Sequence, residues 1–268
     1  MMHRSRRAFT LLEMTMVLAI VGLITGGILL GKNMVHNAQL NSILSDMQGF
    51  FAAERQFKDK YGYLPGDFPM AVRVWGRADG GSDLTSNCAA PATDHANIRG
   101  TCNGDGDGLI TWQNSENFRS WQQMSLAGLI TGTYVGYSNA TTVSNYTLPG
   151  WDSPKPLLKG AAYFMYSWGD QTTASGWYPG NYNNVIEVGA VTTDWPGAVL
   201  FKPAEAYAMD KKTDDGMPGL GNIRTYAVEG GCSQVSYNPD TDTYLKNATA
   251  PGCFLIFMSG YGAPTQSQ

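Results

Sequence analysis

Residues 9–30 read FTLLEMTMVLAIVGLITGGILL and form one apolar run that carries a single charge, at Glu13. About 20 consecutive apolar residues are enough to cross the hydrocarbon core of a bilayer as a helix. The basic segment MMHRSRRA precedes this run, and the positive-inside bias keeps such a segment on the cytoplasmic side. A carboxylate inside an apolar span costs about 2.5–3.5 kcal/mol on insertion scales. We therefore expect Glu13 to have a specific role.

Two ordinary interpretations of the run explain it incompletely. A secretory signal has an apolar core of about 7–15 residues, followed by a cleavage site of small residues. Here the run is longer, and Gly31 and Lys32 lead into further helical sequence. A plain single-pass anchor fits the length but gives Glu13 no role.

The residues around the start of the run, Arg6-Arg7-Ala8-Phe9-Thr10-Leu11-Leu12-Glu13, resemble the class III signal of type IV pilins and type II secretion pseudopilins. In that family a prepilin peptidase cuts before the Phe and methylates the new amine. The resemblance implies processing at Ala8 and Phe9, although the family usually has Gly where this chain has Ala8. It also implies an assembly contact in which Glu13 neutralises the Phe9 amine of a neighbouring subunit. Snorkelling of Glu13 to the membrane interface is the alternative.

The helical pattern continues beyond the apolar run. Between residues 32 and 61, apolar side chains recur at steps of three and four, which predicts an amphipathic helix. No proline interrupts residues 9–61, so one helix of about 80 Å is expected at 1.5 Å per residue. We expect a leader at 1–8, a helix at 9–61 whose residues 9–30 span the membrane or fill a filament core, and a globular domain at 62–268. The predicted stripe consists of Leu40, Ile43, Leu44, Met47, Phe50, Phe51, Phe57 and Tyr61.

The globular part is predicted to be α+β. Pro65 and Gly66 end the long helix, and residues 115–129 resemble a short helix that Ser115 could cap. Several later runs rich in aromatic and β-branched residues are strand candidates. Strands that follow helices in this way favour an antiparallel sheet packed on the long helix, the pilin-like arrangement. The strand candidates are 161–168, 183–189, 197–201, 224–229 and 253–258.

Four cysteines form two local pairs, Cys88 with Cys102 and Cys232 with Cys253. In an oxidising periplasm these pairs predict two disulfides, although crossed connectivity is also possible. Closing loops of this size contributes about 3 kcal/mol for each bond.

The segment NGDGDGLI at 103–110 resembles the first half of an EF-hand loop. There, oxygen ligands at alternating positions face one cation, and Asn103, Asp105 and Asp107 alternate in this way. The twelfth position holds Asn114 instead of the usual Glu, so Glu116 is the expected further ligand. Calcium sites are frequent in pseudopilins, which favours Ca²⁺ by analogy. The alternative is an Asp-Gly turn without a metal.

A second acidic segment lies at 203–221. The pattern predicts a short helix that begins near Pro203 and ends at Asp215-Gly216. Asp210, Asp214 and Asp215 form a possible acidic loop. A solvated or ion-paired surface is the favoured interpretation, and metal ligation is the alternative.

Other classes of function find little support in the sequence. No nucleophile elbow, phosphate loop or Ser-His-Asp pattern is present, so we expect no enzymatic activity. Without the three leader arginines the chain has 15 basic and 22 acidic residues, a net charge of −7, which argues against nucleic-acid binding. Trp151, Trp168, Trp177 and Trp195 could form a sugar-binding surface, but aromatic residues more often fill a core.

These patterns together predict a type IV pilin-like or pseudopilin subunit. The resemblance implies four partners: the prepilin peptidase, other pilin subunits, the inner membrane and an assembly platform. The domain would be periplasmic before assembly, and would lie in a pilus or pseudopilus, at the cell surface or in the periplasm, afterwards. The alternative is a membrane-anchored periplasmic binding protein or adhesin, dependent on carbohydrate or Ca²⁺, that does not polymerise. Pilus, secretion and DNA-uptake systems share such an N-terminus, as do major and minor subunits.

Overall fold

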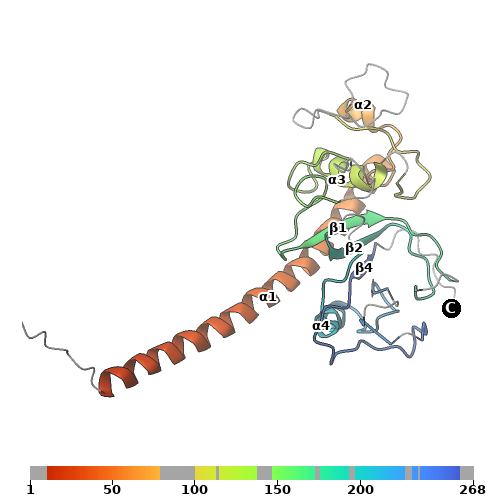
Figure 1. Cartoon of the computed structure of the whole chain (residues 1–268). Helices are drawn as coiled ribbons and strands as arrows, with labels where there is room; N and C mark the ends of the chain where they lie inside the picture. The colour runs from red at the N-terminus through yellow and green to blue at the C-terminus, as the bar shows by residue number, and fades with distance from the viewer. Residues whose placement is uncertain are drawn as a thin grey trace, which may run out of the picture.

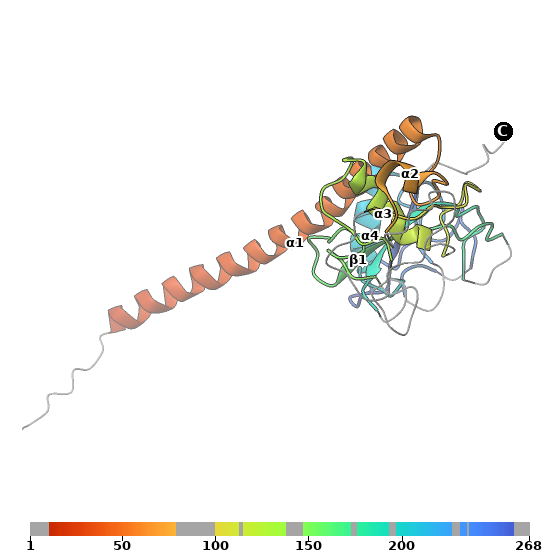
Figure 2. The same ribbon diagram turned by 90° about the horizontal axis from the view of Figure 1, so that it is seen from above.

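The computed structural model has an α+β fold, with a long N-terminal helix and a C-terminal antiparallel sheet (Figure 1). It describes residues 11–78, 100–112, 115–137, 147–172, 176–192, 197–226, 231–234 and 236–259. Helix α1 (Leu11–Tyr61) is continuous over 51 residues, as the absence of proline predicts. Its first half projects away from the globular domain, and its second half runs along that domain (Figures 1 and 2).

The second half of α1 supplies one side of the core. Ile43 and Phe57 are fully buried, and Phe50 packs edge-on against Trp121 and Tyr163. Large apolar side chains at helical spacing bury one stripe of the helix. The predicted stripe is therefore confirmed, and it positions the sheet and the shorter helices on one side of α1.

The sheet has four strands in the order β1-β2-β4-β3, and all neighbours are antiparallel. Three of the predicted strand regions form its main part. The strands are β1 (Ala161–Tyr166), β2 (Val185–Ala190), β3 (Ile223–Arg224) and β4 (Leu255–Met258). The candidate at 197–201 is not a strand: Ala198 and Phe201 form only isolated bridges, to Ala190 and Cys253.

The two faces of this sheet have different neighbours. Because side chains alternate along a strand, Ile186 and Val188 of β2 face the core that includes α1, while Val185 belongs to a second cluster with Tyr182, Phe254 and Ile256. A hydrogen bond from the Tyr163 hydroxyl to Asp46 Oδ2, 2.6 Å long, ties the first face to α1. Both faces are therefore buried near the middle of the sheet.

Three short helices cover the remaining core. They are α2 (Ala71–Trp75), α3 (Glu116–Leu126) and α4 (Pro203–Thr213), and both α3 and α4 contact α1. Ser115 precedes α3 as predicted, but it lies in the left-handed region with φ 57° and its side chain makes no capping hydrogen bond. Glu205 holds the start of α4 by accepting a hydrogen bond from Lys202 N at 2.9 Å.

The Cys232–Cys253 disulfide is present, with a Cα–Cα distance of 4.8 Å. It joins the segment before the last strand to the segment after β3. Cys102 is also disulfide-bonded, whereas Cys88 lies outside the described residues. Among the described residues no cysteine is free.

Candidate functional site

The first half of α1 is an apolar surface that the globular domain leaves uncovered. Leu11 is 84% exposed and Leu23 is 78% exposed, whereas Ile43 on the same helix is completely buried. By length and composition this part of α1 can cross a membrane. Exposed apolar surface of this extent marks a membrane or protein interface. The other large apolar side chains exposed here are Leu12, Met14, Met16, Val17, Leu18, Ile20, Val21, Ile24, Ile28, Leu30, Met34 and Val35.

Glu13 lies in the first turn of the described helix and is exposed. An acidic side chain near a helix N-terminus interacts favourably with the helix dipole. Ala8 and Phe9, the predicted processing residues, lie outside the described residues. The described part of the helix thus presents Glu13 on the same surface as the apolar side chains.

A cluster of three carboxylates joins the predicted calcium loop to the turn after α1. Carboxylate oxygens of Asp67, Asp105 and Glu116 lie within 4.8 Å of one another. Asp67 accepts hydrogen bonds from Gly106 N at 2.5 Å and Gly108 N at 2.8 Å. Glu116 accepts hydrogen bonds from Asp105 N and Thr111 N, both at 3.1 Å. These two carboxylates therefore hold the 105–111 loop by its backbone.

Burial also raises the pKa values of the Asp67 and Glu116 carboxyl groups. Burial raises the pKa of Asp67 to about 6 and that of Glu116 to about 7, and the backbone hydrogen bonds only partly oppose these shifts. Close approach is possible because Gly66 and Gly104 lack side chains: a Cβ at Gly104 would lie 2.4 Å from Asp67 Cα. The loop thus packs directly on the Pro65–Asp67 turn.

The predicted calcium ligands are only partly brought together. Asp105 and Glu116 lie in the cluster with Asp67, which the sequence prediction missed. Asn103 Oδ1 instead accepts a hydrogen bond from Val72 N at 2.9 Å, and Asp107 Oδ1 accepts one from Leu109 N at 2.8 Å. Asp67, Asp105 and Glu116 offer the oxygen ligands that Ca²⁺ prefers, so they are the residues that could hold it. Calcium binding stays a prediction.

The second acidic cluster is Asp210, Asp214 and Asp215 at the end of α4. Asp210 does not lie on a solvated surface: it is fully buried and accepts hydrogen bonds from the Tyr244 hydroxyl at 2.9 Å and Gly216 N at 3.1 Å. Burial raises its pKa to about 7. Asp214 accepts hydrogen bonds from the backbone of Asn222 and Ile223. The cluster ties the turn after α4 to the start of β3.

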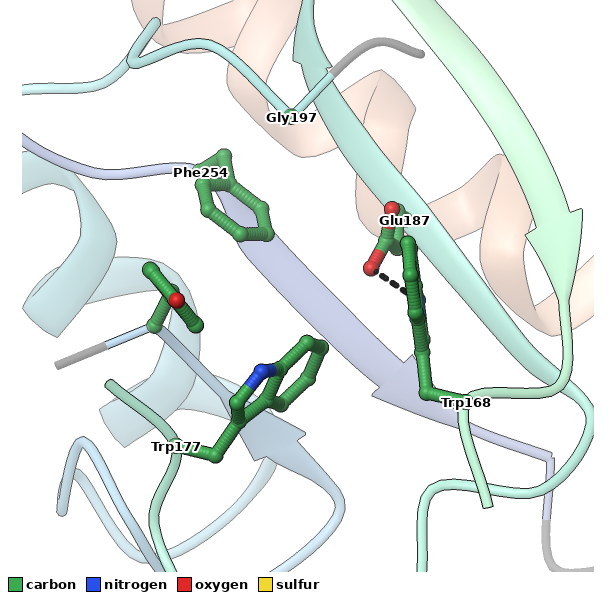
Figure 3. Close-up of a pocket in the computed structure, with 6 residues that line it drawn as sticks. Trp168, Trp177, Glu187, Gly197 and Phe254 are labelled. Atoms are coloured by element: carbon green, nitrogen blue, oxygen red, sulfur yellow. Dashed lines mark hydrogen bonds between the residues drawn. The ribbon is translucent and has the colours of Figure 1, made fainter. Parts of the chain in front are cut away.

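A pocket of about 310 Å³ opens beside the second face of the sheet (Figure 3). Trp168 and Trp177, two of the tryptophans singled out in the sequence, line it with Glu187 of β2. Trp168 Nε1 donates a hydrogen bond of 2.7 Å to Glu187 Oε1. Trp195 lies outside the described residues, and Trp151 is not among the pocket residues.

Sequence reasoning missed five acidic groups that the fold buries: Glu54, Asp67, Asp152, Glu187 and Asp242. Glu187 left a signal, since it is the single charge within the apolar strand VIEVGA. Asp67 directly follows the Pro65-Gly66 turn, a position that only the tertiary structure connects to the distant NGDGDG loop. Glu54 is followed on α1 by the charged residues Arg55 and Lys58, so the sequence pattern does not indicate that its side chain is buried.

Residues 3–29 match the family described as the prokaryotic N-terminal methylation motif. This motif is the signal of type IV pilins and pseudopilins. No curated protein and no solved structure matches the chain. The match covers Ala8, Phe9 and Glu13 and most of the exposed apolar surface of α1.

The chain therefore has the features of a type IV pilin-like or pseudopilin precursor: the methylation motif and an uncovered apolar helix joined to an α+β domain. In general terms the motif implies processing by a prepilin peptidase and assembly with other pilin subunits. The apolar N-terminal helix fits a membrane-anchored pilin.

Proposed function

We propose that the chain is cleaved between Ala8 and Phe9, methylated on the Phe9 amine, and polymerised into a pilus or secretion pseudopilus through the first half of α1. The observation that carries this proposal is the exposed apolar half of α1, which is continuous with a half fixed in the core. A rigid domain on a protruding apolar helix lets subunits leave the membrane and bury the same surface against one another. The methylation motif at residues 3–29 supports the processing step.

In this proposal Glu13 sets the axial position of each subunit. An unpaired charge is costly in an apolar filament core, and pairing with the Phe9 amine of a neighbour removes that cost. The precursor would be anchored in the inner membrane with its domain in the periplasm. The processed subunit would move into the filament with the help of an assembly platform.

Substitution of Glu13 tests this role. Glu13→Ala should still insert and be cleaved, because the apolar run and the cleavage residues are intact, yet it should enter filaments poorly. Thr15→Ala is the matched control: Thr15 lies on the same exposed helix, and its hydroxyl donates only to Leu12 O within the helix. Filaments sheared from the native host and probed for this chain give the measurement. Normal incorporation of Glu13→Ala would show that this charge does not set the register.

A membrane-anchored binding protein that does not polymerise is the second candidate, and the pocket at Trp168, Trp177 and Glu187 favours it. Mass spectrometry of the mature N-terminus separates the two candidates. A methylated Phe9 supports the subunit, and an intact leader supports the anchored binding protein.

A further inference from the structure

The second face of the sheet carries an acidic side chain at its centre. In the antiparallel register Glu187 lies between Phe164 of β1 and Ile256 of β4. Glu187 is fully buried, and its neighbours in the strand are Ile186 and Val188. A charged residue in a central strand is costly unless something pairs with it.

Aromatic rings surround this carboxyl group on the pocket side. Trp168, Trp177, Tyr226 and Phe254 line the pocket together with Glu187 and Gly197 (Figure 3). The ring centroids of Trp168 and Trp177 are 5.5 Å apart at 47°, and those of Trp177 and Tyr226 are 5.0 Å apart at 78°. The rings therefore meet at steep angles and enclose a space, instead of forming one flat platform.

The hydrogen bonding of Glu187 is incomplete within the described part of the chain. Its Oε1 accepts the Trp168 Nε1 proton, but its buried Oε2 has no donor among the described residues. Burial raises the pKa of Glu187 to about 8, and among the described groups only the Trp168 N–H opposes this shift. The pocket thus holds a buried acceptor that lacks both a donor and a compensating cation from these residues.

We propose that this pocket binds the ammonium end of an organic cation, such as a primary or methylated alkylamine. An ammonium N–H donates to Glu187 Oε2, and its positive charge compensates the carboxylate. The aromatic faces attract the same charge by cation–π interaction, which strengthens when the cation is desolvated. The volume of about 310 Å³ is at the lower end of the range of ligand pockets, about 300–1,000 Å³, and suits a small group.

A sugar is the competing ligand, because tryptophans and a carboxylate can also bind hydroxyl groups. A sugar needs several polar partners to pair its hydroxyls, since unpaired buried polar groups are costly. Glu187 is the only carboxylate among the pocket residues, and most of the lining is aromatic. The net charge of −4 for the whole chain also favours the approach of a cation over that of an anion. The inference does not depend on polymerisation.

Calorimetric titration of the full chain, in micelles of an uncharged polyoxyethylene detergent near pH 8, tests the proposal. The probe is n-butylammonium chloride, with sodium chloride as the ionic-strength control. n-Butanol is the neutral comparison, and methyl glucoside represents the sugar. We expect saturable binding of n-butylammonium and no saturable binding of the other three compounds.

Two variants assign the binding to the pocket. Glu187→Gln keeps the size of the side chain and removes its charge, and it should weaken n-butylammonium binding at least about tenfold, a loss of about 1.4 kcal/mol. Trp177→Leu removes a partly exposed ring of the pocket and should weaken binding as well. Trp75→Phe is the control, because Trp75 packs with Phe57 and Phe68 in a different cluster.

Three results would overturn the proposal. The first is the absence of saturable n-butylammonium binding up to about 50 mM. The dissociation constant would then be far above roughly 1 mM, the value that corresponds to a binding free energy of about −4.1 kcal/mol. The second is equal binding of n-butanol, and the third is binding of methyl glucoside in place of the amine. If Glu187→Gln loses its circular-dichroism spectrum or melts early, the Trp177→Leu titration and the ligand comparison decide the matter.

Discussion

At the scale of single residues, the buried acidic side chains differ in the hydrogen bonds that their carboxyl oxygens accept. Asp210 is paired by Tyr244 and a backbone N–H, and Glu187 is paired on one oxygen by Trp168. Glu54 on α1 is 1% exposed, and neither of its carboxylate oxygens has a hydrogen-bond partner among the described residues. Burial raises the pKa of Glu54 to about 8, although Lys58 and Arg55 oppose the shift.

Glu54→Gln should therefore stabilise the domain above neutral pH. The unfolded chain ionises this group near 4.5 and the folded chain near 8, so the wild type loses stability between these two pH values. Gln cannot ionise, and we expect a gain on the order of 2–4 kcal/mol at pH 8 and little change at pH 5. Urea unfolding at both pH values measures the effect.

Asp59→Asn is the control for Glu54→Gln, since Asp59 is exposed on the same helix. It should change stability by less than about 0.5 kcal/mol at either pH. An equal gain at pH 5 and pH 8 for Glu54→Gln would contradict the burial argument.

At the scale of elements, the two halves of α1 lie in different environments along one uninterrupted helix. Its second half is part of the domain core, against Tyr163 of the sheet and Trp121 of α3. In its first half the described large apolar side chains are exposed, a surface suited to a membrane or a neighbouring subunit. Apolar residues therefore form part of the domain core in the second half of α1 and an exposed surface in its first half.

A pair of identical substitutions tests this division. Ile43→Ala should destabilise the domain by about 2–5 kcal/mol, because it leaves a cavity in the core. Ile20→Ala should change domain stability by less than about 0.5 kcal/mol, because Ile20 is 49% exposed and Ile43 is fully buried. Thermal unfolding of both variants in detergent measures the difference. Similar losses for the two variants would mean that the first half of α1 also packs on the domain.

At the scale of the whole molecule, six buried carboxylic acids all make the folded state less stable as the pH rises. Burial raises the pKa of each from an ordinary value near 4 to between about 6 and about 8. Between these values the unfolded chain has released protons that the folded chain still binds, so stability falls as pH rises. The six groups are Glu54, Asp67, Glu116, Asp152, Glu187 and Asp210.

The melting temperature should accordingly be highest in mildly acidic solution and should decrease from about pH 5 to about pH 8. Above about pH 9 the decrease should level off, because these groups are then ionised in both states. Calorimetric melting at constant ionic strength measures the curve, and Glu54→Gln should give a shallower one. A melting temperature that rises with pH across this window would contradict the assigned burial of these acids.

The main elements could be predicted from the sequence because their signals are local. The apolar run and the three- and four-residue spacing determine α1, and β1, β2 and β4 follow from short aromatic and β-branched runs. The segment 197–201 has similar composition, yet it makes only two isolated bridges, Ala198 with Ala190 and Phe201 with Cys253.

The sequence by itself determined the apolar run of residues 9–30 and the methylation motif around Glu13, since both depend only on the order of residues along the chain. The tertiary structure alone decided which acids are buried and what surrounds them. Asp67 meets Asp105 and Glu116 across about 40–50 positions, and Glu187 meets Trp168 and Trp177 only because antiparallel pairing brings their segments together. The physical reason is that burial and pairing of a charge depend on neighbours in space, which no local pattern specifies.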